Sequence, residues 1–274
     1  MNISKLKQNP RVFSRLVGIT PDKFSALVLK IQPLWVKAEF KRRTSHPRKV
    51  KVGGGRPYRL TLEASVAMLL LYTRNYASHA FLAALFDMND SMVCRYFAKI
   101  RPLTESVFKL PARQVDLGEE EIMRLIVDAT EQRTERRKNG PTGYSGKKRA
   151  HTVKTQIVVD HKGNIHHVSK PTPGNVHDKR LFDRSGVKLP NNAKGDLGYL
   201  GTNLTTPFKA SKLHPLTLRQ RSYNRRHSHI RIVIEHVFAS LKSFRILADR
   251  FRGSLRHYHE YFMIVCGLRN LARS

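Results

Sequence analysis

The sequence predicts an all-α region followed by an α/β region. Up to about residue 112, apolar side chains recur every three or four residues, which is typical of helices. After Gly118 they gather in short runs separated by turn residues, which indicates strands. The chain has 274 residues, 40% of them hydrophobic, so it can bury a core.

The chain is strongly basic. It has 51 Lys and Arg residues against 20 Asp and Glu residues, a formal net charge of +31. Such a charge favours a polyanionic partner, and a nucleic-acid backbone is the leading candidate. Two cysteines argue against a disulfide scaffold or a cysteine-rich zinc module. The first residues do not resemble a signal peptide, and the longest apolar stretch, 64–72, is too short to span a bilayer, so we expect no membrane partner.

The all-α region is expected to hold a helical segment at 1–40, a basic Gly-rich linker at 41–59 and a helix-turn-helix at 60–112. The first long helix would begin after Thr20, which would cap it, and would stop or kink at Pro33. The linker carries three consecutive glycines and many cations, so it is either a solvated segment or a phosphate contact.

The helix-turn-helix prediction depends on two short helices, 78–86 and 91–100, joined by a polar turn. Ser91 would cap the second helix, and Pro102 would follow its end. This second helix would be the recognition helix, with Ser91 and Arg95 contacting DNA. An ordinary helical bundle contains similar pairs, so the pattern alone leaves that alternative open.

The α/β region, 119–274, is expected to begin with a buried strand and to end with two helices. The predicted strands are 123–129, 153–160, 165–169 and a short one ending near Asp196; the predicted helices are 177–182, 224–246 and 257–271.

Three acidic residues stand out because carboxylates are scarce in this chain. Asp128 ends an apolar strand, Asp196 lies beside another, and Glu235 lies within the long helix. Carboxylates that converge from two strands and a helix repel one another unless cations join them. In a DNA-handling protein the natural cations are two Mg²⁺ ions, with Mn²⁺ as a substitute. We therefore expect these three residues to bind metal.

The predicted helix around Glu235 carries two cations on the same face. Arg231 and Lys242 fall within about 40° of Glu235 around the helix axis. The carboxylate could bind metal while the cations bind phosphate oxygens. The alternative is a stripe of surface ion pairs, which is common on solvated helices.

Taken in order, these motifs resemble the DDE transposases of bacterial insertion sequences, in the DDE superfamily endonuclease branch related to Harbinger-type elements. The stretches that carry the resemblance are 127–130 (VDAT), 174–178 (GNVHD), 195–199 (GDLGY) and Arg231, Glu235 and Lys242 in the spacing of a Tyr–Arg–Glu–Lys signature. The tyrosine of that signature is missing, because its position holds Ser228.

The resemblance implies an RNase H-like fold, a mixed sheet flanked by helices. Asp128 and Asp196 would lie on adjacent central strands, with Glu235 on the following helix. It implies that these three acids are catalytic. The chain would bind the terminal inverted repeats of its element as double-stranded DNA, hydrolyse the element ends and join the 3′ ends to target DNA. Pairing of two ends favours a homodimer. The expected location is the bacterial cytoplasm, at the nucleoid.

Other cations near the three acids are expected to contact the DNA backbone, although solvated loops are the alternative. They are Arg133, Arg137, Lys147, Lys148, Arg225 and Arg226. Asp178 is interpreted as a supporting residue rather than a metal ligand. The alternative function is a non-catalytic DNA-binding regulator derived from a transposase, against which the intact set of acids argues.

Overall fold

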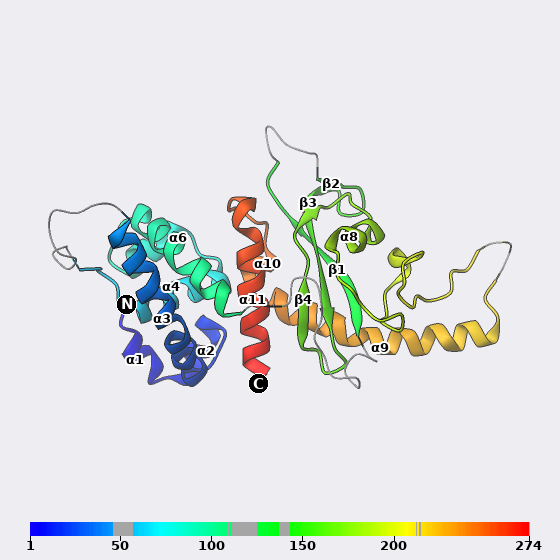
Figure 1. Cartoon of the computed structure of the whole chain (residues 1–274), viewed down its shortest axis with the longest axis horizontal. Coiled ribbons are helices and arrows are strands. Elements are labelled where there is room, and N and C mark those ends of the chain that lie inside the picture. The colour runs from blue at the N-terminus through cyan, green and yellow to red at the C-terminus, as the bar shows by residue number, and fades with distance from the viewer. Residues whose placement is uncertain are drawn as a thin grey trace. The chain divides into compact units, whose positions relative to one another are not determined.

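The computed structural model describes residues 1–45, 57–108, 110, 125–136, 143–211, 213 and 215–273 (Figure 1). They fall into two compact units. The first comprises Met1–Lys109, Phe244–Ile246 and Glu260–Ser274, and the second comprises Leu110–Ser243 and Leu247–His259. The predicted boundary at 112–118 lies outside the described residues.

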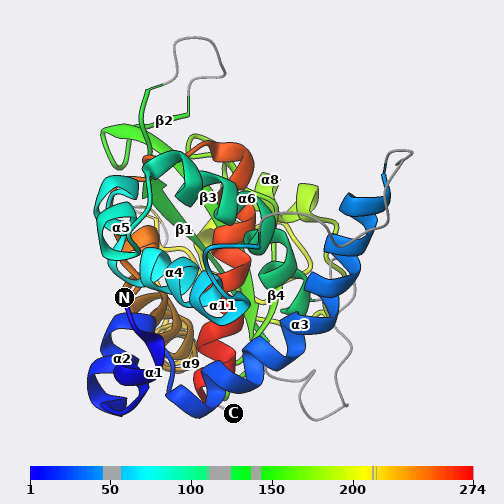
Figure 2. The ribbon, with the colours of Figure 1, turned by 90° about the vertical axis from the view of Figure 1, so that its left-hand side faces the viewer.

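The first unit is all-α. Its helices are α1 (Ile3–Lys7), α2 (Pro10–Val17), α3 (Pro21–Thr44), α4 (Leu62–Asn75), α5 (His79–Leu85), α6 (Asp90–Val107) and the part of α11 (Tyr258–Arg273) from Glu260 onward. Helix α4 is the centre of the unit, because the run Ser65–Thr73 is buried throughout and α1, α2, α3 and α6 all contact it. Figure 2 shows α3 as the long blue helix that runs past α4 and α6.

The sequence predicted that the first long helix stops or kinks at Pro33, and the helix does not stop there. Thr20 caps α3 as predicted, but the helix continues through Pro33 to Thr44 and so includes the first residues of the predicted linker. Packing against α4 and α6 holds α3 together and outweighs the hydrogen bond that a proline removes. Residues 46–56 of that linker lie outside the described part of the chain.

The predicted helix-turn-helix pair consists of α5 and α6. Ser78 caps α5 by accepting a hydrogen bond from the Phe81 N–H at 3.1 Å. The cap of α6 is Asn89 rather than Ser91, because the Asn89 side chain accepts the Met92 N–H at 3.0 Å. Helix α6 also continues through Pro102 instead of ending there.

The end of the chain, from Glu260 onward, groups with the first unit. Two contacts account for this grouping. Tyr261 of α11 packs against Tyr72 of α4, with ring centroids 5.6 Å apart. Glu260 forms an ion pair with Arg101 of α6, whose side chain is buried. The apolar face of α11 therefore completes the helical core.

The second unit is an α/β unit with a mixed sheet. Its strands are β1 (Ile126–Arg133), β2 (Tyr144–Ser145), β3 (Ala150–Val159), β4 (Ile165–Val168) and β5 (Thr172–Pro173). Strand β3 pairs antiparallel with all the others, and Asp128 of β1 lies opposite Ile157. A parallel bridge between Ile126 and Lys194 makes the sheet mixed.

Helices flank this sheet, as an RNase H-like fold requires. The helical elements of this part of the chain are α8 (Asp178–Ser185), the 3₁₀ turn η1 (Leu197–Tyr199), α9 (Leu218–Lys242), α10 (Arg245–Ala248), of which only Leu247 and Ala248 belong to this unit, and η2 (Leu255–His257). Helix α9 starts earlier than predicted, because Thr217 and Gln220 form a capping box. It contacts β1 and buries Ile234, Val237 and Leu241.

One predicted strand is wrong. Asp196 does not lie on a strand; only Lys194, two residues earlier, forms bridges, to Ile126 and to Thr205. Asp196 instead caps η1 by accepting the Gly198 N–H at 2.8 Å. None of the described helices has the length and apolar character needed to cross a bilayer.

Candidate active site

Asp128 lies on β1 beneath helix α9. Its carboxylate accepts a hydrogen bond from Arg231 Nη2 of α9 at 2.9 Å and another from the Ala129 N–H at 2.7 Å. Burial raises the pKa of Asp128 above its ordinary value; Arg231 opposes this rise, and the negative charge of Asp196 adds to it. Asp128 therefore carries a charge that its protein surroundings only partly compensate.

The bridge between Lys194 and Ile126 brings Asp196 alongside Asp128. A third carboxylate, Asp178, comes from the first turn of α8. Both Asp178 and Asp196 face Gly198: their nearest oxygen atoms lie 2.6 and 3.0 Å from the position that a Cβ atom would take there. Because glycine has no side chain, position 198 leaves room for the carboxylates of Asp178 and Asp196.

Tyr199 lies beneath this acidic group. It is fully buried and packs edge-on against Phe182, with ring centroids 6.1 Å apart. Its hydroxyl has no hydrogen-bond partner among the described residues. Burial raises the pKa of Tyr199 well above its ordinary value, and the charges of Asp128, Asp178 and Asp196 raise it further. The hydroxyl is therefore neutral and cannot compensate the carboxylates with charge.

A cleft of about 550 Å³ opens over these groups, a size typical of ligand sites. Its lining includes four acidic residues, Asp128, Glu131, Asp178 and Asp196, and four basic ones, Lys147, Lys148, Lys154 and Lys242. The structure thus places Lys147, Lys148 and Lys242, which we predicted as DNA contacts, at the cleft. Carboxylates and ammonium groups in one cleft suit a phosphodiester that is bound together with metal ions.

Sequence reasoning missed Lys154, which fixes one wall of the cleft. From β3, its Nζ donates to the Val176 carbonyl at 2.8 Å and to Asp178 Oδ1 at 3.0 Å, and it lies 3.4 Å from Glu131 Oε1. Lys154 is buried, and the presence of a lysine within a predicted strand was the available signal. It orients Asp178, which supports the interpretation of Asp178 as a supporting residue.

The structure does not bring Glu235 to this cluster. Its side chain is exposed and does not line the cleft, although Phe238 and Lys242 on the same face of α9 do. Across the described ranges, no group of three or more acidic, histidine or cysteine side chains is arranged to hold a metal ion. Arg231, predicted as a DNA contact, forms an ion pair with Asp128.

The remaining predicted DNA contacts are spread over both units. Arg133 is exposed at the end of β1, and Arg225 and Arg226 are exposed on the first half of α9. Ser91 and Arg95 are exposed on α6, where the Ser91 hydroxyl donates to Asn89 Oδ1 at 2.9 Å. Arg137 lies outside the described residues.

An acidic cleft bordered by lysines in an α/β unit, together with a helix-turn-helix, defines the class of endonucleases that act on DNA. Residues 127–270 match the family model described as DDE superfamily endonuclease, and residues 58–109 match the helix-turn-helix of the same superfamily. The chain therefore belongs to the DDE superfamily endonucleases.

Two curated relatives carry transposase names. The chain is 33% identical over 282 residues to a protein of Microchaete diplosiphon named as a probable transposase for insertion sequence element IS702, with 98% of each chain covered. It is 27% identical over 224 residues to a protein of Streptomyces albus G named as a transposase for insertion sequence element IS112, with 80% of this chain and 83% of the relative covered. No solved structure matches the chain.

Proposed function

We propose that this chain is the transposase of an insertion sequence. It binds the terminal inverted repeats of its element as double-stranded DNA, cleaves the element ends by phosphodiester hydrolysis and joins the 3′ ends to target DNA. The observation that carries the proposal is the convergence of Asp128 and Asp196 in a cleft lined by lysines. The transposase names of both relatives support it.

The donor set of the cleft fits divalent metal ions. Mg²⁺ prefers carboxylate oxygens, and the cleft offers those of Asp128 and Asp196, with Arg231 offsetting only part of the burial of Asp128. Asp128 and Asp196 would hold the metal, with Mn²⁺ as a substitute for Mg²⁺. Two bound ions would activate a water or a 3′-hydroxyl and stabilise the leaving oxygen.

Glu235 is proposed as the third acid. It is one helical turn from Arg231, which already contacts Asp128, so a movement of α9 or of the Glu235 side chain would have to bring its carboxylate to the cleft. DNA binding supplies a reason for that movement, because the phosphate charge would attract Lys242 on the same face of α9.

The protein side chains would bind and orient the DNA. Lys147, Lys148 and Lys242 would bind phosphate oxygens in the cleft, while Arg231 holds Asp128 in place. Ser91 and Arg95 on α6 would read the terminal repeats, and Arg133, Arg225 and Arg226 would contact the backbone. Two copies of the chain would pair the two ends of the element.

The test is cleavage of a labelled duplex that carries the terminal repeat, with Mg²⁺ or with EDTA. We expect metal-dependent nicking at the repeat end, reduced by about 10³-fold or more in Asp128→Asn and in Glu235→Gln with DNA binding retained. Asp183→Asn, an exposed aspartate on α8, is the matched control and should cleave normally. Tight repeat binding without cleavage in Mg²⁺ or Mn²⁺ would instead identify a DNA-binding regulator.

A further inference from the structure

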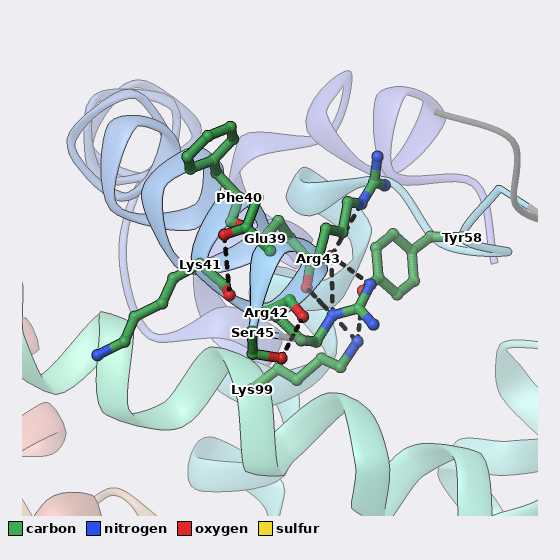
Figure 3. Close-up of polar contacts among 9 residues, drawn as sticks. Glu39, Phe40, Lys41, Arg42, Arg43, Ser45, Tyr58 and Lys99 are labelled. Atoms are coloured by element: carbon green, nitrogen blue, oxygen red, sulfur yellow. Dashed lines mark hydrogen bonds and ion pairs between the residues drawn. The ribbon is translucent and has the colours of Figure 1, made fainter. Parts of the chain in front are cut away.

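The last turns of helix α3 carry a buried carboxylate surrounded by cations. The Glu39 side chain is only 12% exposed. Arg42 Nη2 lies 2.8 Å from Glu39 Oε2, Arg43 Nε lies 3.7 Å from the same oxygen, and Lys99 Nζ of α6 lies 3.5 Å from Oε1. Figure 3 shows the three cations converging on Glu39, while Phe40 and Lys41 point away from them. We call Arg42, Arg43 and Lys99, arranged on Glu39, the basic cradle.

Glu39 is negatively charged at all physiological pH values. Burial alone would raise its pKa, but hydrogen bonds from Arg42 and Tyr58 and the charges of Lys99 and Arg42 outweigh burial and lower the pKa to about 2. A single negative charge is thus set against three positive ones. The cradle as a whole is positively charged.

The excess positive charge faces solvent. The side chains of Arg42, Arg43 and Lys99 are 52, 41 and 32% exposed. A guanidinium group has five N–H donors, and one carboxylate cannot engage those of two arginines. Three cations held together repel one another, and an anion bound on the outer side would relieve that repulsion.

Aromatic side chains fix the position of Lys99 within the cradle. Its ammonium group lies over the Tyr58 ring, 4.3 Å from the centroid, and contacts the Tyr58 hydroxyl. Trp35 of α3 packs edge-on against the same ring, with centroids 5.4 Å apart. The cradle is therefore ordered before any ligand binds, which lowers the entropic cost of binding.

The cradle continues the DNA-facing side of α6. Lys99 lies four residues after Arg95, so both side chains project from the same face of the helix. Glu39, Arg42 and Arg43 precede residues 58–109, which match the helix-turn-helix model, so the cradle joins that module to a helix outside it.

We propose that the basic cradle binds a phosphate of the DNA backbone beside helix α6 and thereby sets the orientation of that helix on the duplex. This inference rests on the proposed function, in which α6 reads DNA. Contacts to phosphates position a protein without reading sequence, so the cradle should contribute equally to the affinity for any duplex.

The first test compares two double variants of equal charge by fluorescence anisotropy over a series of salt concentrations. One is Arg42→Gln with Arg43→Gln; the control is Arg11→Gln with Arg15→Gln, two exposed arginines on α2. Helix α2 packs at the start of α3, through Phe13 and Phe24, about 22 Å along the helix axis from Glu39. The probes are a labelled duplex with the terminal repeat and a scrambled duplex of the same length.

We expect the cradle variant to lose affinity for both duplexes on the order of tenfold or more, and its salt slope to fall by about one, because one phosphate contact is lost. The control variant should keep the salt slope of the parent chain. Equal losses of DNA affinity in the two variants would contradict phosphate binding by the cradle, because only the overall positive charge would then explain the attraction. If the parent chain binds neither duplex, the proposed function itself fails.

The second test uses a variant for which diffuse electrostatic attraction and the basic cradle predict opposite changes in DNA affinity. Glu39→Gln adds one positive charge, so diffuse attraction predicts tighter DNA binding. The cradle predicts binding weaker by about threefold or more, because Arg42, Arg43 and Lys99 lose the group that holds them together. Unchanged or tighter binding would contradict the proposal. Circular dichroism checks that the variant folds; if it does not, the arginine variants decide.

Discussion

The two units of this chain surround their buried carboxylates in opposite ways. In the first unit, Glu39 has three protein cations within 4 Å, and its pKa falls to about 2. In the second unit, Asp128 has one close cation, Arg231, and shares its cleft with other acids, so burial dominates and its pKa rises. Glu39 is fully compensated from within the protein. Asp128 is compensated only in part, by Arg231, so its carboxylate is the one at which we expect an outside cation.

The two kinds of carboxylate have different roles. A carboxylate that the protein already compensates can only arrange its own cations, as Glu39 does. A carboxylate with incomplete compensation is costly to the fold, and functional sites are where such costs are retained. The acidic cleft is therefore the place to expect metal binding, and the basic cradle is the place to expect an anion.

The largest effect is expected from a substitution at Gly198, which lies against two carboxylates of the acidic cleft. Gly198→Ala places a Cβ atom within 3.0 Å of oxygen atoms of both Asp178 and Asp196, so the two carboxylates must move apart. We expect the rate of repeat-end cleavage to fall on the order of 10²-fold, as when catalytic groups are misplaced by about 1 Å.

Gly146→Ala is the matched control for Gly198→Ala. Gly146 also lines the cleft, but a Cβ atom there meets nothing within 4 Å. Its cleavage rate should stay within about twofold of the parent rate in a parallel assay. Equal rates for the two variants would show that close packing at Gly198 is unimportant for the chemistry.

A smaller effect is expected on the stability of the fold in acid, and it differs between Glu39 and Asp128. Because folding lowers the pKa of Glu39 from 4.5 to about 2, its contribution is fully present above pH 4.5 and is lost as the pH falls toward 2. That contribution is up to about 3 kcal/mol. The contribution of Asp128 to stability changes with pH in the opposite direction. Its pKa is raised in the folded state, so protonation as the pH falls removes the unfavourable free energy of a buried, charged carboxylate.

Trp35, the single tryptophan, reports on the first unit because it packs against Tyr58 beside Glu39. Urea unfolding followed by Trp35 fluorescence should show stability falling between about pH 4.5 and 2 in the parent chain. The fall should be much smaller in Glu39→Gln. Parallel pH curves for the two chains would show that Glu39 is not held as an ion by its neighbours.

Local signals in the sequence predicted much of the fold. Thr20 caps the helix that was expected to follow it, and Ser78, the first residue of the predicted helix 78–86, caps α5. The strands around β3 and the long helix α9 were also expected from their apolar runs. These features depend on neighbours in the chain, so the order of residues is sufficient to find them.

Features that depend on distant residues could not be predicted. Pro33 and Pro102 stay inside helices because tertiary packing outweighs a local preference. Asp196 reaches the cleft through a single bridge residue, Lys194, which leaves no strand pattern.

The candidate site was predictable only in part, for the same reason. The motifs identified Asp128 and Asp196, and the structure brings them together. Helical spacing placed Glu235 on the face of α9 that carries Arg231 and Lys242, but spacing does not determine how far a side chain lies from a cleft. Lys154 was missed because its partners, Asp178 and Glu131, are distant in the sequence.

The most direct test of the central claim is a Mn²⁺ titration of the full chain, with free Mn²⁺ measured by electron paramagnetic resonance. We expect the parent chain and Glu39→Gln to bind Mn²⁺ equally, because Glu39 is compensated within the protein. Asp128→Asn should lose that binding, because Asp128 is the carboxylate at which we expect an outside cation. Equal Mn²⁺ binding by the parent chain and Asp128→Asn would contradict the account.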